Sequence, residues 1–208
     1  MSKDKIKIRT GSRISAILQS TVTYAQAFTE LAKNALQNGA SFVDIKLSEG
    51  GAVITDDGLG FNHEKDDTGM TGFEKYFVFG NSYDMFDGVG LQLGHMGIGG
   101  KIANDKLSDN TDIHWTIETK NKHGKHFLVT YAPKEVEFLD DYEPTVEELK
   151  DVSIKTKSGT VITIHNLDTP LVQHGWDLGE IKTSLRNFFG HLARTGETNF
   201  DIILNGHS

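Results

Sequence analysis

Two short segments contain residues that could do chemistry together, Glu30-Leu-Ala-Lys-Asn34 and Asp56-Asp-Gly58-Leu-Gly60. The first lies in a stretch with helical period, in which residues i and i+4 share a face, so Glu30 and Asn34 project side by side. The second has the glycines of a turn and follows a predicted strand. A carboxylate beside an amide oxygen suits the deprotonation of a water molecule and the binding of Mg²⁺. The sequence therefore predicts a cleft between this helix face and the turn that contains Asp56.

A third segment is rich in glycine: Gly94-His-Met-Gly97-Ile98-Gly99-Gly100-Lys101. A glycine backbone can approach phosphate groups closely, and the first N–H groups of the helix predicted from Ile102 favour anions. Lys101 adds a positive charge at the start of that helix. A fourth segment, residues 159–165, alternates as a strand and begins with the pair Gly159-Thr160. These two segments extend the predicted cleft toward an anionic ligand.

In this order, the four segments resemble the motifs of the GHKL superfamily, which includes gyrase B subunits, heat-shock 90 chaperones, MutL, MORC proteins, topoisomerase VI B subunits and histidine kinases. The resemblance covers residues 10–206. Each motif alone is common, but four in register are specific. The resemblance implies the Bergerat ATP-binding fold as a single domain over residues 1–208. The glycine-rich segment, preceded by Phe79-Gly-Asn-Ser82, looks closest to the MORC and heat-shock 90 pattern.

The resemblance implies a role for each motif residue. Glu30 would orient and deprotonate the attacking water, and Asn34 would give its amide oxygen to Mg²⁺. Asp56 would accept a hydrogen bond from the adenine amino group, with Thr160 supporting both through its hydroxyl and an ordered water. The residues expected to bind ATP and its metal are Asn34, Asp56, Gly58, Gly60, Gly94, Gly97, Ile98, Gly99, Gly100, Lys101 and Thr160.

Ordinary structural roles remain open for the same residues. A glutamate on a surface helix is usually only solvated, and Asp-Gly is a common turn pair. Asn34 is less easily explained, because asparagine is a poor helix former and is unexpected in mid-helix unless its side chain has a role. Gln37 departs from the family pattern, since many relatives have aspartate there. His123 and His126 flank a predicted hairpin turn, where the absence of a nearby carboxylate set disfavours a metal site.

Periodicity and turn residues predict the elements that must position the motifs. Helices are expected at residues 23–37, from 102 and at 176–194, and strands at 41–47, 52–55, 112–120, 126–132, 159–165 and 200–204. The acidic segment 135–151 is expected to be a short capped helix or a solvated insertion. This order predicts an α+β fold, a two-layer sandwich of a mixed, mainly antiparallel sheet with helices on one face. Residues 62–96, rich in glycine and mixed charge between two ligand motifs, are expected to form a mobile ATP lid.

Composition narrows the class of protein. At 208 residues the chain suits one domain with a substantial core. No apolar stretch is long enough to span a membrane, and the N-terminus lacks the apolar part of a signal peptide, so a cytoplasmic location is expected. The absence of cysteine excludes disulfides and thiolate catalysis. A net charge of -8 argues against a broad attraction to nucleic acid.

The resemblance implies a GHKL-type ATPase that uses ATP and Mg²⁺ and couples its nucleotide state to lid closure. The resemblance also implies an ATP-dependent homodimer within a larger machine, with a DNA or protein client bound through regions outside this chain. Two alternatives stay open. One is an interaction module that binds ATP with negligible turnover. The other is a phosphotransferase of the histidine-kinase type, which Glu30 disfavours because such kinases commonly have asparagine at that position.

Overall fold

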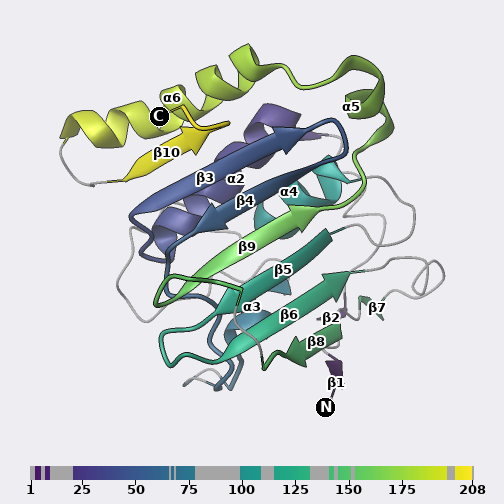
Figure 1. Ribbon diagram of the computed structural model, residues 1–208, viewed down its shortest axis with the longest axis vertical. Coiled ribbons are helices and arrows are strands. Elements are labelled where there is room, and N and C mark those ends of the chain that lie inside the picture. Colours follow the sequence, from purple (N-terminus) through teal and green to yellow (C-terminus); the bar gives the residue numbers. More distant parts are fainter. Residues whose placement is uncertain are drawn as a thin grey trace.

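The computed structural model describes residues 3–5, 8–9, 21–65, 67, 69–77, 99–108, 115–131, 141–142, 145–150, 153–195 and 200–207. Within these ranges, eight strands form one sheet in the order β1-β8-β6-β5-β9-β4-β3-β10. Neighbouring strands are antiparallel except β10, which is parallel to β3. Helices α2, α3 and α4 lie on the same face of this sheet (Figure 1). The predicted α+β sandwich with a mainly antiparallel sheet is confirmed.

The strands are β1 (Lys3–Lys5), β2 (Ile8–Arg9), β3 (Phe42–Ser48), β4 (Gly51–Asp56), β5 (Trp115–Lys120), β6 (His126–Tyr131), β7 (Asp141–Tyr142), β8 (Thr145–Glu148), β9 (Gly159–Ile164) and β10 (Asp201–Leu204). The helices are α2 (Tyr24–Gln37), α3 (Gly72–Phe77), α4 (Gly99–Leu107), α5 (Thr169–His174) and α6 (Leu178–Thr195). Strands β2 and β7 pair with each other outside the main sheet.

Helix α2 is specified at its first turn and buried along most of its length. Thr23 and Gln26 form a reciprocal capping box, in which each side chain accepts a hydrogen bond from the backbone N–H of the other. Phe28, Leu31 and the alanines of the helix are buried against the sheet and neighbouring helices. On another face the hydroxyls of Thr29 and Ser184 lie 2.8 Å apart, which joins α2 to α6. The helix is therefore held on several sides.

The core fills the space between the sheet and its helices. Burying one large apolar side chain contributes about 1.5–3 kcal/mol, so the largest side chains dominate this layer. The largest fully buried side chains are Trp115, Phe28, Phe73, Phe127, Leu31, Ile45, Leu107, Ile117, Ile164 and Ile181. They come from both layers, and the core therefore fixes the position of the helices over the sheet.

Strand β9 lies between β4 and β5 and brings two predicted motifs together. Its register places Thr160 opposite Asp56 of β4 on one side and opposite Thr119 of β5 on the other. The last residue of the β3–β4 hairpin is thus fixed beside the Gly-Thr pair that begins β9. Of the described helices, none is long and apolar enough to cross a membrane.

Three segments differ from the sequence-based expectations or extend them. Residues 145–148 form strand β8 in the sheet, with Val146 buried, so the expectation of a short helix there is wrong. Helix α4 begins at Gly99, three residues before the predicted Ile102. The predicted lid, residues 62–96, includes helix α3, whose Phe73 and Tyr76 are 2% and 5% exposed. Residues 78–98 lie outside the described part of the chain, so the lid itself stays a prediction.

Gly60 offers a test of the turn after β4. Its φ is +67°, and a Cβ atom there would lie 2.2 Å from the carbonyl oxygen of Lys120. We expect Gly60→Ala to lower the free energy of unfolding by about 2–4 kcal/mol, from the left-handed backbone and the overlap together. Gly69 is the control, since its φ is +75° but nothing lies within 4 Å of its Cβ position. Equal losses in urea denaturation of the two variants would show that the close approach is unimportant.

Candidate functional site

After its first turn, helix α2 presents one polar stripe that is not fully buried, composed of Glu30, Lys33, Asn34 and Gln37. Glu30 and Asn34 share this face, as their i,i+4 spacing predicts. The Glu30 side chain is 32% exposed, and its Oε2 contacts the ammonium group of Lys33, whose side chain is only 12% exposed. The carboxylate therefore has a cationic partner on its own helix. Sequence reasoning overlooked Lys33, although an acid and a base at i and i+3 form a recognisable pair.

The end of the glycine-rich segment lies directly against Asn34. A Cβ atom on Gly100 would lie 2.6 Å from Nδ2 of Asn34 and 2.7 Å from the hydroxyl oxygen of Tyr76. A side chain at position 100 would therefore displace the side chain of Asn34 or Tyr76. Gly99, Gly100 and Lys101 belong to the first turn of α4, which brings this turn beside the stripe of α2. Gly94, Gly97, Ile98 and the side chain of Lys101 lie outside the described part of the chain.

A buried polar pair supports this junction. Asn104 of α4 is fully buried and donates a hydrogen bond of 3.1 Å from Nδ2 to the hydroxyl oxygen of Tyr76 on α3. Burial, and next the charge of Asp105, raises the pKa of Tyr76 above its ordinary value, so the phenol stays neutral. The pair links α3 to α4 just behind Gly100. Sequence reasoning missed both residues, because only the packing of the three helices brings them together.

Asp56 is a buried carboxyl at the end of β4, with 8% of its surface exposed. Its Oδ1 accepts a hydrogen bond of 2.8 Å from the backbone N–H of Gly58. Burial raises the pKa of Asp56 from 3.8 to about 7, a shift that the N–H of Gly58 opposes and the charge of Asp57 increases. A carboxyl that is shielded from solvent and has few hydrogen-bond donors around it is suited to accept a hydrogen bond from a ligand.

The neighbouring Asp57 has a different role. Its carboxylate accepts hydrogen bonds from the backbone N–H groups of Ser41, at 2.7 Å, and of Phe42, at 3.1 Å. It also contacts the Ser41 hydroxyl. Asp57 therefore ties the turn to the start of β3, while Asp56 points into the buried side of the same turn. The two adjacent aspartates thus have different environments, and Asp56, which the sequence analysis selected, is the buried one.

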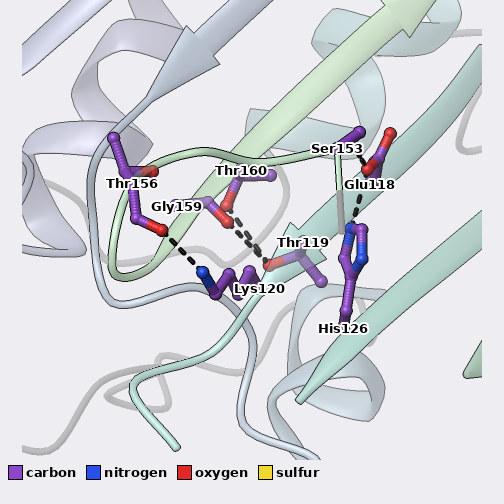
Figure 2. Close-up of polar contacts among 8 residues, drawn as sticks. All are labelled: Glu118, Thr119, Lys120, His126, Ser153, Thr156, Gly159 and Thr160. Carbon is purple, nitrogen blue, oxygen red and sulfur yellow. Dashed lines mark hydrogen bonds and ion pairs between the residues drawn. The ribbon is translucent and has the colours of Figure 1, made fainter. Parts of the chain in front are cut away.

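Thr160 is buried at 3% exposure, and its hydroxyl lies 3.5 Å from that of Thr119 on β5 (Figure 2). The Thr119 hydroxyl also donates to the carbonyl of Gly159, at 3.3 Å, and accepts a hydrogen bond of 3.0 Å from the N–H of Phe61. Thr119 therefore connects the exit of the Asp56 turn to the start of β9. Sequence reasoning missed Thr119, because its place opposite Thr160 follows from a pairing of distant strands.

The segment before Gly159 is held by contacts on the other face of the sheet. Lys120 donates from its ammonium group to the carbonyl oxygen of Thr156 at 2.8 Å (Figure 2). Glu118 contacts the hydroxyl of Ser153, and its Oε1 lies 2.7 Å from Nε2 of the buried His126. The glutamate stands between the hydroxyl and the imidazole, so this cluster does not have the serine-to-histidine contact of a nucleophilic triad. Its evident effect is to anchor the approach to Thr160.

The two halves of the site are joined by one backbone hydrogen bond. The carbonyl oxygen of Asn38, which ends α2, accepts a bond of 3.0 Å from the N–H of Leu59 in the Asp56 turn. Gly58 lies between these groups, where an added Cβ atom would be 3.0 Å from both the Asn38 carbonyl oxygen and Oδ1 of Asp56. The arrangement places the stripe of α2, the first turn of α4 and the buried Asp56 at one junction.

The overall structure is similar to solved ATPase domains. The ATPase and transducer domains of DNA topoisomerase II from Balamuthia mandrillaris match with a TM-score of 0.56 at 22% sequence identity, over 88% of this chain and 47% of that chain. The ATPase region of Saccharomyces cerevisiae topoisomerase II matches with a TM-score of 0.54 at 18% identity, over 88% and 47%. The chain has the fold of these ATPase domains.

A third match extends this likeness to gyrase. The 43K ATPase domain of Thermus thermophilus gyrase B, solved with an aminocoumarin, has a TM-score of 0.53 at 19% identity, over 89% of this chain and 44% of that one. The chain thus spans less than half the length of each of these three structures. No protein-family model and no curated protein sequence matches the chain. The closer motif likeness to MORC and heat-shock 90 proteins stays a prediction from the sequence.

The pKa of Asp56 predicts how stability depends on pH. Because the carboxyl ionises near 7 in the folded chain and near 3.8 otherwise, folding is penalised above pH 7, and this penalty disappears as the pH falls toward 4. We expect Asp56→Asn to be more stable than the parent at pH 8, by up to about 4 kcal/mol, and the difference to shrink by pH 5. Thermal or urea unfolding of both proteins at the two pH values measures this. A difference independent of pH would contradict the buried ionisation.

Proposed function

We propose that the chain binds ATP with Mg²⁺ and hydrolyses it, as a GHKL-type ATPase domain. One observation carries this proposal. The glycine-rich start of α4 lies against Asn34 of α2, and the C-terminal end of α2 contacts the turn that contains the buried Asp56. These contacts support a site in which the start of α4 binds phosphate, Asn34 holds the metal and Asp56 recognises the base. The fold shared with topoisomerase II and gyrase B ATPase domains supports the same function.

Asp56 is the residue that selects the base. Its ionised carboxylate accepts a hydrogen bond from the exocyclic amino group of adenine, and the Thr160 hydroxyl beside it supports the base through an ordered water. Guanine would place a carbonyl oxygen against the carboxylate, which leaves two acceptors without a proton and costs about 1–3 kcal/mol. Gly58 and Gly60 keep the backbone of this turn close and free of side chains.

The first turn of α4 receives the phosphates. Its first N–H groups and the helix dipole favour negative charge, and Gly99 and Gly100 leave space for it. Lys101 adds positive charge, and Gly94, Gly97 and Ile98 extend the same cradle in this proposal. Asn34 fits the metal, because its side-chain amide lies beside Gly100 and contains an oxygen, a hard donor of the kind Mg²⁺ prefers. When bound, Mg²⁺ neutralises phosphate charge and makes the γ-phosphorus more electrophilic.

Glu30 is the general base. It lies one helical turn before Asn34 on the same face and accepts the proton of the water that attacks the γ-phosphorus. The bond between the γ-phosphorus and the bridging oxygen breaks as the water oxygen bonds, and ADP and phosphate leave. A second candidate function, ATP binding with negligible turnover, is favoured by the contact that Lys33 makes with the Glu30 carboxylate. Phosphotransfer of the histidine-kinase type is less compatible with a glutamate at this position.

Further parts of the proposal concern the larger assembly. We expect the lid to close over ATP and to promote a homodimer in the cytoplasm, within a machine that acts on DNA or protein. The matched topoisomerase II and gyrase B structures are about twice as long as this chain, which supports the idea of additional domains in such a machine.

Base selectivity tests the assignment of Asp56. At pH 8, where its carboxyl is ionised, we expect ATP to bind about tenfold to a hundredfold more tightly than GTP. Asp56→Asn should abolish most of this preference, because an amide can offer a donor to the guanine carbonyl. Asp44→Asn, on the strand next to β4, should leave it unchanged. Calorimetric titrations give the ATP and GTP affinities of each protein, and equal binding of ATP and GTP by the parent would remove Asp56 as the selective group.

Turnover tests the assignment of Glu30. Glu30→Gln keeps the shape of the side chain but removes the base, so ATP should still bind while hydrolysis falls about a hundredfold to ten-thousandfold. Glu49→Gln, in the exposed turn between β3 and β4, is the matched control and should hydrolyse ATP at the parent rate. The measurement is steady-state phosphate release with saturating Mg²⁺. A Glu30→Gln protein as fast as the parent would exclude Glu30 as the base.

A further inference from the structure

Lys33 is a member of the α2 stripe to which the proposed function gives no task. It directly precedes Asn34, and its ammonium group contacts Oε2 of Glu30. Its side chain is only 12% exposed, whereas the ion-paired Lys46 on β3 is 69% exposed. Lysine is rarely held away from water unless its charge is compensated. Lys33 therefore loses much of its hydration at the edge of the candidate site.

The contact with Glu30 is a weak reason for this placement. Charge pairs at i and i+3 on a helix contribute little, and Glu30 is itself about one-third exposed, so water screens the pair. A terminal phosphate has more negative charge and more acceptor oxygens than one carboxylate. It would compensate the ammonium better wherever the two anions compete for it.

The position of Glu30 brings such a phosphate within reach. A general base that takes a proton from the attacking water is separated from the γ-phosphorus by that single water. An ammonium group in contact with the base is therefore close to the γ-phosphate oxygens, and the flexible stem of lysine allows a small shift between the two anions. The β-phosphate of ADP lies one bridging oxygen farther away.

We propose that Lys33 is a ligand of the γ-phosphate and makes the site prefer ATP to ADP. This inference rests on the proposed ATP binding. In the free protein Lys33 pairs with Glu30. In the ATP complex its ammonium group donates to a γ-phosphate oxygen, which releases Oε2 of Glu30 from its intrahelical partner and leaves the carboxylate available for the water. This change of partner by Lys33 links recognition of the triphosphate to the availability of Glu30 as a general base.

The test compares affinities for ADP and for a non-hydrolysable ATP analogue, each with Mg²⁺, by calorimetric titration. We expect Lys33→Met to lower the affinity for the analogue about tenfold to a hundredfold, while the affinity for ADP changes less than about threefold. Lys33→Arg keeps the charge and should restore most of the preference. Lys46→Met, which removes an ion-paired lysine from β3, is the control and should leave both affinities unchanged.

The outcomes separate the inference from the proposed function. An unchanged ratio of the two affinities in Lys33→Met, whether or not both affinities fall, would overturn the role of Lys33 while leaving ATP binding intact. Failure of the parent protein to bind either nucleotide would overturn the proposed function and this inference with it. The ADP affinity also confirms that each variant is folded, because the base-binding half of the site is untouched by these substitutions.

Discussion

The candidate site depends on the burial of helix α2. The sheet, α4 and α6 contact this helix, and the apolar residues and alanines along it are almost completely buried. The capping box at Thr23 fixes where the helix starts, and the Thr29 contact with Ser184 fixes its rotation relative to α6. Only a narrow polar stripe remains, so the direction in which Glu30 and Asn34 point is set by the packing of the other faces. The orientation of Glu30 and Asn34 is therefore a consequence of how the core packs around α2.

The opposite wall of the site is held by hydrogen bonds rather than by apolar packing. Asp57 ties the turn after β4 to the start of β3, and Thr119 ties its exit to β9. These bonds keep Asp56 buried with a pKa near 7, a condition that costs stability at neutral pH and above. A ligand that donates a hydrogen bond to this carboxylate would offset that cost, and the site is therefore arranged to gain from binding.

Local sequence patterns predicted most of the elements but not how they pair. The period of residues 23–37 and the alternation of β5, β6 and β9 were strong enough to place those elements, because their apolar faces are regular. Strand β8 was mistaken for a short helix or insertion, since its four residues include two glutamates and its partner β6 is distant in sequence. The placement of β9 between β4 and β5, which gives Thr119 its role, also depends on non-local pairing.

Three of the predicted site residues break a local rule or are buried at a cost. Asn34 is a poor helix former in mid-helix, Gly100 lies in the first turn of a helix, and Asp56 is a buried acid. Each violation is explained by a contact from another element: Gly100 makes room for Asn34 and Tyr76, and the turn around Gly58 closes over Asp56. Tyr76 and Thr119 obey their local rules and so gave no signal, whereas Asn104, in the middle of α4, breaks the same rule as Asn34. The matched ATPase structures share this fold at only 18–22% identity, because a core tolerates many different apolar sequences. The positions of Asn34, Gly100 and Asp56 differ from the core, since each has a requirement that one residue type meets best.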